Sequence, residues 1–462
     1  MKRYEAYDSF LDIWVDEIPS HWETHKMKYL FHERSEKGYP DEPLLVASQN
    51  MGVVPKNVYG NRTVEAQKDL HLLKLVRVGD FVISLRSFQG GLEYAYYQGI
   101  ISPAYTVLTP HEPITAGYFR YLAKSKLFIG LLTLCVTGIR EGQNIDYEKL
   151  RNHLLPVPPR EEQDQIVRYL DWQVSKINRL IAAKRKEIAL LKEQKQRRIT
   201  EVVTHGLNPN VPHKDSGIAW IGAIPAHWHC VALKRCATVK SGITLGKQYP
   251  VGTKLVSVPY LRVANVQDGF VNTETVTHLN VTPEEATQYA LPKGCVLMTE
   301  GGDRDKLGRG CVWNGEIEHC IHQNHIFAVT VNDKLLLNKW LEYVSACDIG
   351  RVYFDVTAIK TTNLACTNAS KVMAFPIPLP PRDEQECIVN ELNRITSRYN
   401  DARKSLEKQI ECLQELRTRL ISDVVTGQAD VRGVEVPEYE KFEEVSSADK
   451  EYEDIEERMD VE

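Results

Sequence analysis

Residues 156–163 read Pro-Val-Pro-Pro-Arg-Glu-Glu-Gln, and residues 378–385 read Pro-Leu-Pro-Pro-Arg-Asp-Glu-Gln. The second stretch follows the first at a shift of 222 positions, and the same shift carries residues 199–204 onto residues 421–426 without a gap. A repeat of this length indicates duplication within one gene. It decides the architecture, because two copies of one pattern are expected to fold alike.

The repeat extends toward the N-terminus at a smaller shift of 206 positions. The positions that match are aromatic residues, prolines and histidines in the same order: Trp14, Ile18, Pro19, His21 and Trp22 match Trp220, Ile224, Pro225, His227 and Trp228. The difference between the two shifts predicts insertions in the second copy. Each half therefore consists of a variable globular segment followed by a nearly constant one.

The constant segments have the pattern of long helices. Residues 160–205 and 382–426 contain neither Gly nor Pro, follow a proline pair, begin with acidic residues and end before Gly206 or Gly427. Apolar residues recur at alternating spacings of three and four, which is typical of a coiled coil. A helix of about 45 residues is roughly 67 Å long. Antiparallel pairing of the two helices within the chain is the simplest way to bury both seams, and dimerisation with another chain is the alternative.

The variable segments, 15–155 and 221–377, mix short β-rich runs with helical stretches such as 116–133 and 335–347. The predicted fold class is mixed α/β: two copies of a globular domain, separated by two long antiparallel coiled-coil helices, with an internal pseudo-two-fold duplication. The expected boundaries are a first globular domain at 1–158, a first helix at 159–206, a linker and second globular domain at 207–379, a second helix at 380–430 and an acidic, disordered tail at 431–462.

Charge is distributed unevenly along the 462 residues. The net charge is −5, but residues 436–462 carry −9, which leaves the rest of the chain at +4. A mildly basic body is compatible with nucleic-acid binding, and the tail is either a solubilising extension or an element that mimics DNA or docks a partner. No apolar run reaches about 18 residues, so a cytoplasmic location is expected. The ten cysteines are irregularly spaced without a Cys-x-x-Cys pair, which predicts reduced thiols and no metal site.

Polar, Gly-bearing loops between the β-rich runs are candidates for DNA contact. Arg, Lys, Asn and Gln can bind base edges, whereas Ser, Thr and Gly suit phosphates, although ordinary surface loops have the same composition. The candidates in the first half are Ser84, Arg86, Ser87, Gln89, Thr137, Gly138, Arg140 and Gln143. Those in the second half are Lys240, Ser241, Arg262, Asn265, Arg304, Lys306, Arg309, Lys360 and Thr361.

Sequence signatures of catalysis are missing. The chain has no Gly-x-x-x-x-Gly-Lys-Ser/Thr phosphate loop, no Gly-x-Gly-x-x-Gly after a strand and no Asn/Asp-Pro-Pro-Tyr/Phe motif. The stretch 301–310, with four glycines and several charges, could cradle a phosphate and fits a DNA-backbone loop at least as well. A stand-alone enzyme is therefore disfavoured.

The arrangement of motifs resembles a known family. Two variable segments, each introduced by Trp-x-x-x-Ile-Pro-x-His-Trp and closed by Pro-x-Pro-Pro-x-x-Glu-Gln before a long helix, are similar to the specificity subunit of type I restriction-modification systems. The resemblance covers the chain to about residue 430. The second copy has Ala358 where the first has Gly138, so the geometry of that loop is expected to differ.

The resemblance implies a non-catalytic subunit in which each variable segment reads one half of an asymmetric, bipartite DNA site. Two modification subunits, with S-adenosylmethionine, would methylate adenine, and restriction subunits using ATP and Mg would join them; this chain would bind none of these cofactors. Glu162, Gln163, Glu384 and Gln385 are expected to dock the partners on the exposed faces of 160–204 and 382–426. The alternative is a coiled-coil adaptor that does not bind specific DNA.

Overall fold

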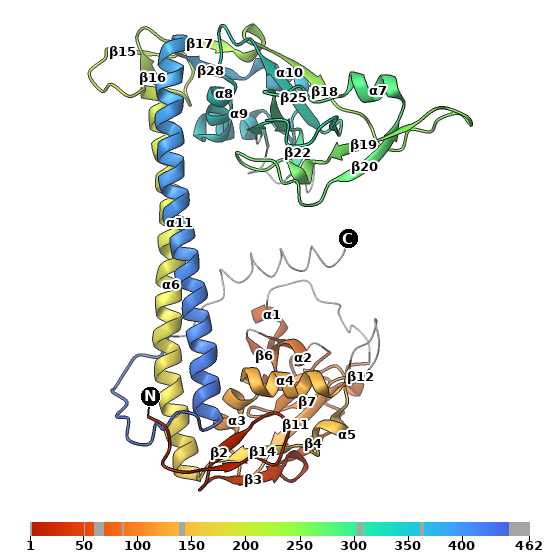
Figure 1. Cartoon of the computed structure of the whole chain (residues 1–462), viewed down its shortest axis with the longest axis vertical. Helices are drawn as coiled ribbons and strands as arrows, with labels where there is room; N and C mark the ends of the chain where they lie inside the picture. Colours follow the sequence, from red (N-terminus) through yellow and green to blue (C-terminus); the bar gives the residue numbers. More distant parts are fainter. Residues whose placement is uncertain are drawn as a thin grey trace. The chain divides into compact units, whose positions relative to one another are not determined.

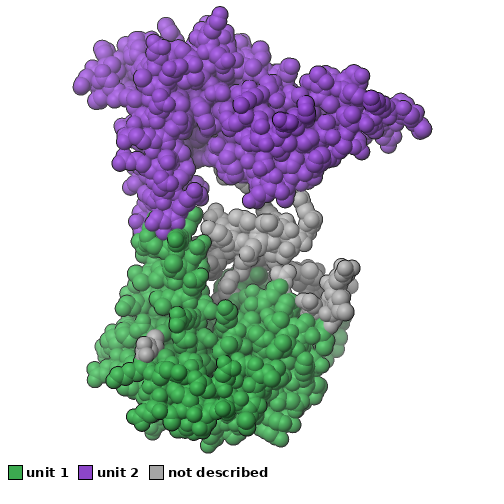
Figure 2. All heavy atoms as spheres, in the orientation of Figure 1, with its two compact units in different colours: residues 1–185, 406–462 green, residues 186–405 purple. Residues whose placement is uncertain are grey.

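The computed structural model describes residues 2–49, 51–59, 69–85, 87–137, 144–302, 307–308, 310–360 and 365–442. The chain divides into two compact units (Figure 2). Unit 1 contains residues 1–185 and 406–462, and unit 2 contains residues 186–405. Each unit therefore holds one globular segment and parts of both long helices (Figure 1).

Unit 1 is built around a four-stranded antiparallel sheet of order β4-β11-β8-β9. Its strands are β1 (Tyr7–Ser9), β2 (Glu17–Pro19), β3 (Glu23–Lys26), β4 (Phe31–Arg34), β5 (Leu45–Ser48), β6 (Gly52–Pro55), β7 (Lys74–Val76), β8 (Phe81–Ile83), β9 (Glu93–Tyr94), β10 (Gly99–Ile101), β11 (Thr106–Pro110), β12 (Val136–Thr137), β13 (Asn144–Ile145) and β14 (Leu154–Val157). Its shorter helices are α1 (Lys56–Tyr59), α2 (Ser87–Gly90), α3 (Ala116–Leu122), α4 (Lys126–Leu134) and α5 (Tyr147–Leu150).

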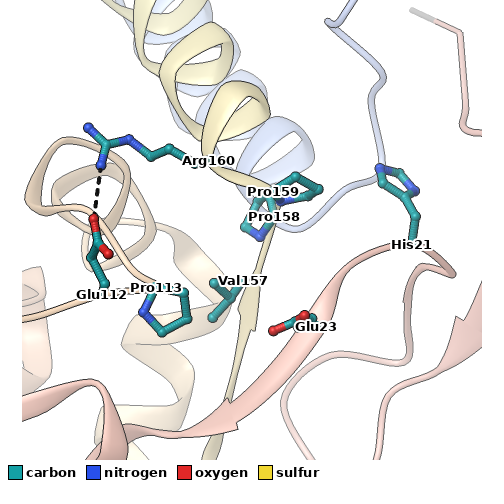
Figure 3. Close-up of a pocket in the computed structure, with 8 residues that line it drawn as sticks. All are labelled: His21, Glu23, Glu112, Pro113, Val157, Pro158, Pro159 and Arg160. Carbon is teal, nitrogen blue, oxygen red and sulfur yellow. Dashed lines mark ion pairs between the residues drawn. The ribbon is translucent and has the colours of Figure 1, made fainter.

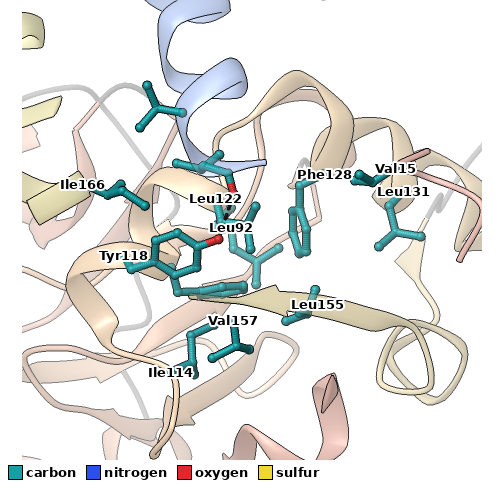
Figure 4. Close-up of a cluster of buried hydrophobic side chains, with 14 of the residues drawn as sticks. Val15, Leu92, Ile114, Tyr118, Leu122, Phe128, Leu131, Leu155, Val157 and Ile166 are labelled. Carbon is teal, nitrogen blue, oxygen red and sulfur yellow. Dashed lines mark hydrogen bonds between the residues drawn. The ribbon is translucent and has the colours of Figure 1, made fainter. Parts of the chain in front are cut away.

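The core of unit 1 lies where the globular segment meets the long helices. Tyr118, Leu122, Leu155, Val157 and Ile166 are all buried there and come from α3, β14 and the first long helix (Figure 4). The same cluster includes apolar residues near the end of the second long helix. Burial of this continuous apolar surface fixes the globular segment to the helices.

Unit 2 has the same plan with a larger insertion. Its sheet of order β18-β25-β21-β23 repeats the order of the sheet in unit 1, and a separate sheet of order β20-β19-β24 is added. Its strands are β15 (His213–Asp215), β16 (Ala223–Pro225), β17 (His229–Ala232), β18 (Ala237–Ser241), β19 (Val256–Leu261), β20 (Thr277–Val281), β21 (Val296–Thr299), β22 (Gly301–Gly302), β23 (Gly310–Val312), β24 (Ile321–His322), β25 (Ile326–Val331), β26 (Ile359–Lys360), β27 (Ala365–Cys366) and β28 (Pro376–Leu379). Its shorter helices are α7 (Pro283–Gln288), α8 (Asn338–Ala346), α9 (Asp348–Thr357) and α10 (Ala369–Ala374).

The long helices are α6 (Arg160–His205) and α11 (Arg382–Val425). In unit 1 the first part of α6 pairs with the last part of α11, where Arg417 donates to the Asn178 Oδ1 at 2.7 Å. In unit 2 the last part of α6 pairs with the first part of α11, where Lys195 Nζ lies 3.5 Å from the Asn400 Oδ1. The helices are therefore antiparallel, and the predicted fold class is confirmed.

The helix predicted at 116–133 is wrong in one respect, because the structure divides it into α3 and α4. The side chain of Ser125 accepts a hydrogen bond from the backbone N–H of Phe128, as an N-cap does, so a new helix begins there. The prediction of a disordered tail from residue 431 is wrong for residues 431–442, because they pack against unit 1 and make hydrogen bonds to α6. The residues from 443 onward lie outside the described residues. Within the described part of the chain, no helix is both long and apolar enough to span a bilayer.

Candidate functional site

The two motifs that the sequence repeats meet in space at the start of α6. The Glu162 carboxylate, whose side chain is 5% exposed, accepts hydrogen bonds from the Trp22 Nε1 at 3.1 Å and from the Tyr4 hydroxyl, and it lies 2.8 Å from the His21 Nε2. Burial, followed by the Glu162 carboxylate, raises the pKa of Tyr4 well above 10, so the hydroxyl stays protonated and donates. This set of contacts is called clasp 1.

The equivalent contacts form at the start of α11. The Trp228 Nε1 donates to the Glu384 carboxylate at 3.0 Å, and the His227 Nε2 lies 2.8 Å from it. This set is called clasp 2. It has fewer donors than clasp 1, because Asn210 occupies the position that matches Tyr4, and the Glu384 side chain is 31% exposed.

The glutamine that follows each clasp glutamate bonds to three backbone groups, and these groups lie at equivalent positions in the two copies. The Gln163 side chain accepts from the Thr115 N–H and donates to the carbonyl groups of Pro113 and Pro158, each at 2.9 Å. The Gln385 side chain bonds in the same way, at the same distances, to Leu337, Leu335 and Pro380. All these partners are related by the shift of 222 positions. Both glutamines are fully buried and tie the helix start to the segment before α3 or α8.

The end of the other long helix completes each clasp. Gly427, after α11, has φ +74° and lies against Pro19 and Trp22, so that a Cβ would be 2.3 Å from the Pro19 Cδ. Gly206, after α6, has φ +73° and lies against Trp228, 3.2 Å from the position of a Cβ. Glycine meets both requirements, a left-handed backbone and close packing against an indole. Each clasp therefore joins a globular segment, the start of one long helix and the end of the other.

A shallow hollow beside clasp 1 has a volume of about 240 Å³ and is lined by His21, Glu23, Glu112, Pro113, Val157, Pro158, Pro159 and Arg160 (Figure 3). An ion pair between Arg160 and Glu112, 3.7 Å apart, crosses it, and these side chains are 60% and 89% exposed. Such an exposed pair contributes little to stability. The lining consists largely of three prolines and a solvated ion pair. The hollow is therefore interpreted as the junction between neighbouring secondary-structure elements.

The structure corrects the prediction that the clasp residues dock a partner. Glu162, Gln163 and Gln385 are buried, and Glu384 is half-buried against Trp228. Their hydrogen-bonding groups are directed to other parts of the same unit. They therefore hold the domain to the helices and do not form an exposed docking surface.

Among the DNA-contact candidates of the first half, Gln89 and Thr137 are exposed and Ser84 is half-buried. Ser87 is fully buried, and its hydroxyl accepts from the Ser84 N–H at 2.8 Å at the start of α2. The structure thus gives Ser87 a local structural role and not the predicted surface one. The other candidates, Arg86, Gly138, Arg140 and Gln143, lie outside the described residues.

In the second half, Lys240 and Ser241 are exposed at the end of β18, and Arg262 is half-buried. Asn265 is only 3% exposed; its side chain accepts from the Arg262 N–H and donates to the carbonyl groups of Asn272 and Thr275. It holds a loop together and cannot present its amide to a base. Arg304, Lys306, Arg309 and Thr361, together with the side chain of Lys360, lie outside the described residues.

Two of the candidate loops occupy equivalent places in the fold. In unit 1, β12 and β13 pair Thr137 with Asn144, and in unit 2, β26 and β27 pair Ile359 with Cys366. Both members of each pair are related by 222 positions, so the two hairpins share one register. In this register Lys360 is the counterpart of Gly138, so the expected match of Gly138 with Ala358 is wrong. The segments 138–143, which contains Gly138, Arg140 and Gln143, and 361–364, which contains Thr361, connect these strands in the sequence. The strands that flank these two segments therefore occupy equivalent positions in the two units.

Glu93 and His322 are buried titratable groups outside the clasps. Burial raises the pKa of Glu93 to about 7, although the ammonium of Lys124 lies 2.7 Å away. Burial lowers the pKa of His322 to about 4. Within the described ranges, no three His, Cys, Asp or Glu side chains are placed to hold a metal ion.

Several known proteins are similar to this chain in sequence or in fold. No family model matches the sequence. A putative type I restriction enzyme MjaX specificity subunit of Methanocaldococcus jannaschii is 23% identical over 208 residues, which cover 45% of this chain and 47% of the relative. The MjaVIII specificity subunit of the same organism is 24% identical over 64% of this chain and 66% of its own length. The StySPI specificity subunit of Salmonella potsdam is 20% identical over 70% of this chain and 67% of its own length.

These alignments span between about half and two thirds of the relatives. In structure, the chain is similar to a protein solved in work on complex assembly and conformational transition of the type I R-M system, with a TM-score of 0.63, 16% identity and coverage of 89% of this chain and 99% of that one. This likeness concerns the fold. The resemblance to type I specificity subunits, predicted from the repeated motifs, is confirmed.

Proposed function

We propose that this chain is the DNA-recognition (specificity) subunit of a type I restriction-modification complex. In this role it binds an asymmetric, bipartite DNA target in the cytoplasm and directs adenine methylation and cleavage, which partner subunits catalyse. The observation that carries the proposal is the duplication of the clasp. Two globular segments are joined by equivalent contacts to the starts of two antiparallel helices, and the sequence is similar to that of specificity subunits.

Each globular segment, within residues 1–158 and 207–379, acts in this proposal as a target recognition domain for one half-site. The sheets of the two segments share one strand order, which gives a common scaffold, while their different insertions allow different bases to be read. Lys240, Ser241, Gln89 and Thr137 are the exposed candidates among the described residues. The hairpin loops 138–143 and 361–364 remain proposed contact segments.

Two modification subunits dock, in this proposal, on the exposed faces of α6 and α11, since a duplicated helix offers the same kind of surface twice. Restriction subunits join the resulting complex. The clasps serve this function by position: they fix each recognition domain to the helix start, so that its orientation to the docked methyltransferase is constant. Rigid support of this kind is what site-specific methylation requires.

Methyl transfer tests the proposal. The modification subunit of the same system is incubated with genomic DNA and labelled S-adenosylmethionine, with and without this chain. We expect label in DNA only when both proteins are present. Equal labelling without this chain, or no labelling by a stable assembly of the two, would reject the specificity role. DNA retardation by the assembly also separates this role from that of a coiled-coil adaptor.

Lys240→Glu tests the proposed DNA surface in the same assembly. Lys240 is exposed on β18, and loss of one phosphate contact is expected to weaken DNA binding about tenfold and to reduce the salt slope by about one. Lys334→Glu makes the same charge change in an exposed turn after β25 and serves as the control. Equal affinities of the two variants would remove Lys240 from the proposed contact surface.

A further inference from the structure

The segment after α11 breaks the symmetry of the two long helices. Ala429 and Val431 are buried in the core of unit 1, and residues 434–442, called the C-terminal strap, continue along the first part of α6 (Figure 1). The Gln165 side chain donates to the carbonyl groups of Val431 at 3.0 Å and Val434 at 2.7 Å. The strap thus starts from a fixed, buried anchor.

Farther along α6 the strap makes two more hydrogen bonds. The Phe442 N–H donates to the Ser175 hydroxyl at 2.7 Å, and the Arg179 guanidinium donates to the Glu440 carbonyl at 3.0 Å. Most of the strap is nevertheless exposed, including Tyr439 at 37%. A segment held by a few hydrogen bonds and partly buried valines, with its polar backbone open to water, can be displaced without unfolding its anchor.

The residues of α6 that bond to the segment after α11, namely Gln165, Ser175 and Arg179, and the two rings between them on the helix, Tyr169 and Trp172, can be compared with their duplicates on α11. Gln165, Tyr169, Trp172, Ser175 and Arg179 correspond, at the shift of 222, to Cys387, Glu391, Arg394, Ser397 and Asp401. Tyr169 and Ser175 are 6% and 5% exposed, whereas Arg394 and Ser397 are exposed and Glu391 is half-buried.

The chemistry of the two faces differs as well. The face on α6 places the Tyr169 and Trp172 rings in edge contact, with centroids 6.1 Å apart. The face on α11 has an ion pair, Glu391 with Arg394 at 2.7 Å, in place of these aromatic rings. One duplicated face therefore contains two aromatic rings and carries its own peptide, and the other is charged and open to solvent.

We propose that the C-terminal strap competes with a modification subunit for the face on α6, so that two identical partners bind this chain in two unequal steps. The first partner binds the open face on α11, and the second binds the face on α6 after the strap has been released. This inference rests on the proposed function. It assigns a regulatory role to the segment that carries the acidic tail, because a tethered strap occupies its site at a high effective concentration.

The test compares three chains by isothermal titration with the purified modification subunit and by native mass spectrometry. The chains are the full protein, a chain ending at Gly433 that keeps the buried anchor and lacks the strap, and a chain ending at Phe442 that keeps the strap and lacks only residues 443–462. Val434→Asp with Val436→Asp in the full protein is a second way to release the strap, because both valines pack against the core of unit 1.

We expect the full protein and the chain ending at Phe442 to bind two partners with affinities that differ about tenfold or more. This is the effect of breaking the three hydrogen bonds to Val434, Glu440 and Phe442 before the second partner binds. The chain ending at Gly433 and the double aspartate variant should bind both partners with nearly equal affinity.

Two results would overturn the inference while the proposed function stands: equal affinities in the full protein, or weaker second binding when the strap is removed, which would make the strap part of the docking surface. A modification subunit that binds none of the chains would overturn the proposed function and the inference with it. Unfolding curves of the shortened chain, matching those of the chain ending at Phe442 apart from a small shift, show that the anchor is intact.

Discussion

Replacement of Glu162 by alanine is expected to destabilise unit 1 more than the equivalent replacement of Glu384 destabilises unit 2. The two glutamates hold the same position in the repeat, yet their side chains are 5% and 31% exposed. Glu162 accepts from Tyr4 and Trp22 inside the protein, whereas Glu384 bonds to Trp228 at the edge of solvent. Comparison of the two alanine variants therefore separates the effect of burial on stability from the effect of position in the repeat.

The magnitude follows from the groups that lose their partner. Glu162→Ala leaves the Tyr4 hydroxyl and the Trp22 Nε1 buried without an acceptor, at about 1–3 kcal/mol each, so the expected loss is about 3–5 kcal/mol. In Glu384→Ala, water can reach the exposed part of the site and replace the carboxylate. The loss there should be about 1–2 kcal/mol.

Scanning calorimetry of the full chain measures both losses, since each kcal/mol lowers the Tm of a unit of this size by roughly 2–4 °C. Hydrogen exchange of peptides near Trp22 and Trp228 assigns each change to its unit. Glu161→Ala and Asp383→Ala are the matched controls, because both carboxylates are exposed in the same first helical turns. Each control should lose only the stabilisation that a carboxylate provides at a helix N-terminus, about 0.3–1 kcal/mol.

The reasoning would be refuted if Glu162→Ala cost no more than Glu161→Ala, because the clasp would then not hold the domain. It would also be refuted if Glu384→Ala cost more than Glu162→Ala, since burial would not govern the strength of the contact. A loss of stability confined to unit 2 in Glu162→Ala, or to unit 1 in Glu384→Ala, would contradict the assignment of the clasps to their units.

Three further outcomes follow from buried polar groups. Gln163→Ala and Gln385→Ala should lower the stability of their own units by nearly equal amounts, about 2–4 kcal/mol by calorimetry, because both side chains have the same three partners at the same distances. Unit 1 should lose about 2–3 kcal/mol as pH rises from 4.5 to 7, because Glu93 keeps its proton more strongly when folded than when unfolded; urea titrations of Glu93→Gln should lack this slope. Unit 2 should lose stability as pH falls from 6.5 to 4, because the folded state holds His322 neutral while the unfolded state takes up the proton. Hydrogen exchange of peptides around His322 at pH 4.5 and 7, divided by the intrinsic exchange rate at each pH, measures this loss, and equal protection at both pH values would contradict the buried site.

The repeated motifs were sufficient to predict the long helices and the duplication, because Gly, Pro and the apolar period act locally. The contacts between the motifs could not be predicted in this way. His21 and Trp22 are more than a hundred positions from Glu162, and nothing in the linear pattern distinguishes a buried glutamate from an exposed one. The repeated motifs therefore contain most residues of each clasp, but they suggested a partner surface for residues that the fold buries.

For some residues, comparison of the two copies could not predict the contacts that the structure shows. Tyr4 completes clasp 1 but has Asn210 as its counterpart, so no repeated pattern marks it. Thr115 and Leu337 differ in side chain and share only a backbone N–H, which any residue except proline could provide. Asn265 has the right amide for a base contact, and only its three internal hydrogen-bond partners reveal its local role.

The measurement that tests the central claim most directly is methylome sequencing of cells that express this chain with its modification subunit, before and after exchange of residues 233–375 for those of a relative. This exchange leaves both clasp 2 and the strand pair β17-β28 in place. The account predicts methylated adenine in a split motif, of which the exchange alters one half and preserves the other. Absence of a split motif from cells that contain the assembled complex, or a change in both halves, would contradict it.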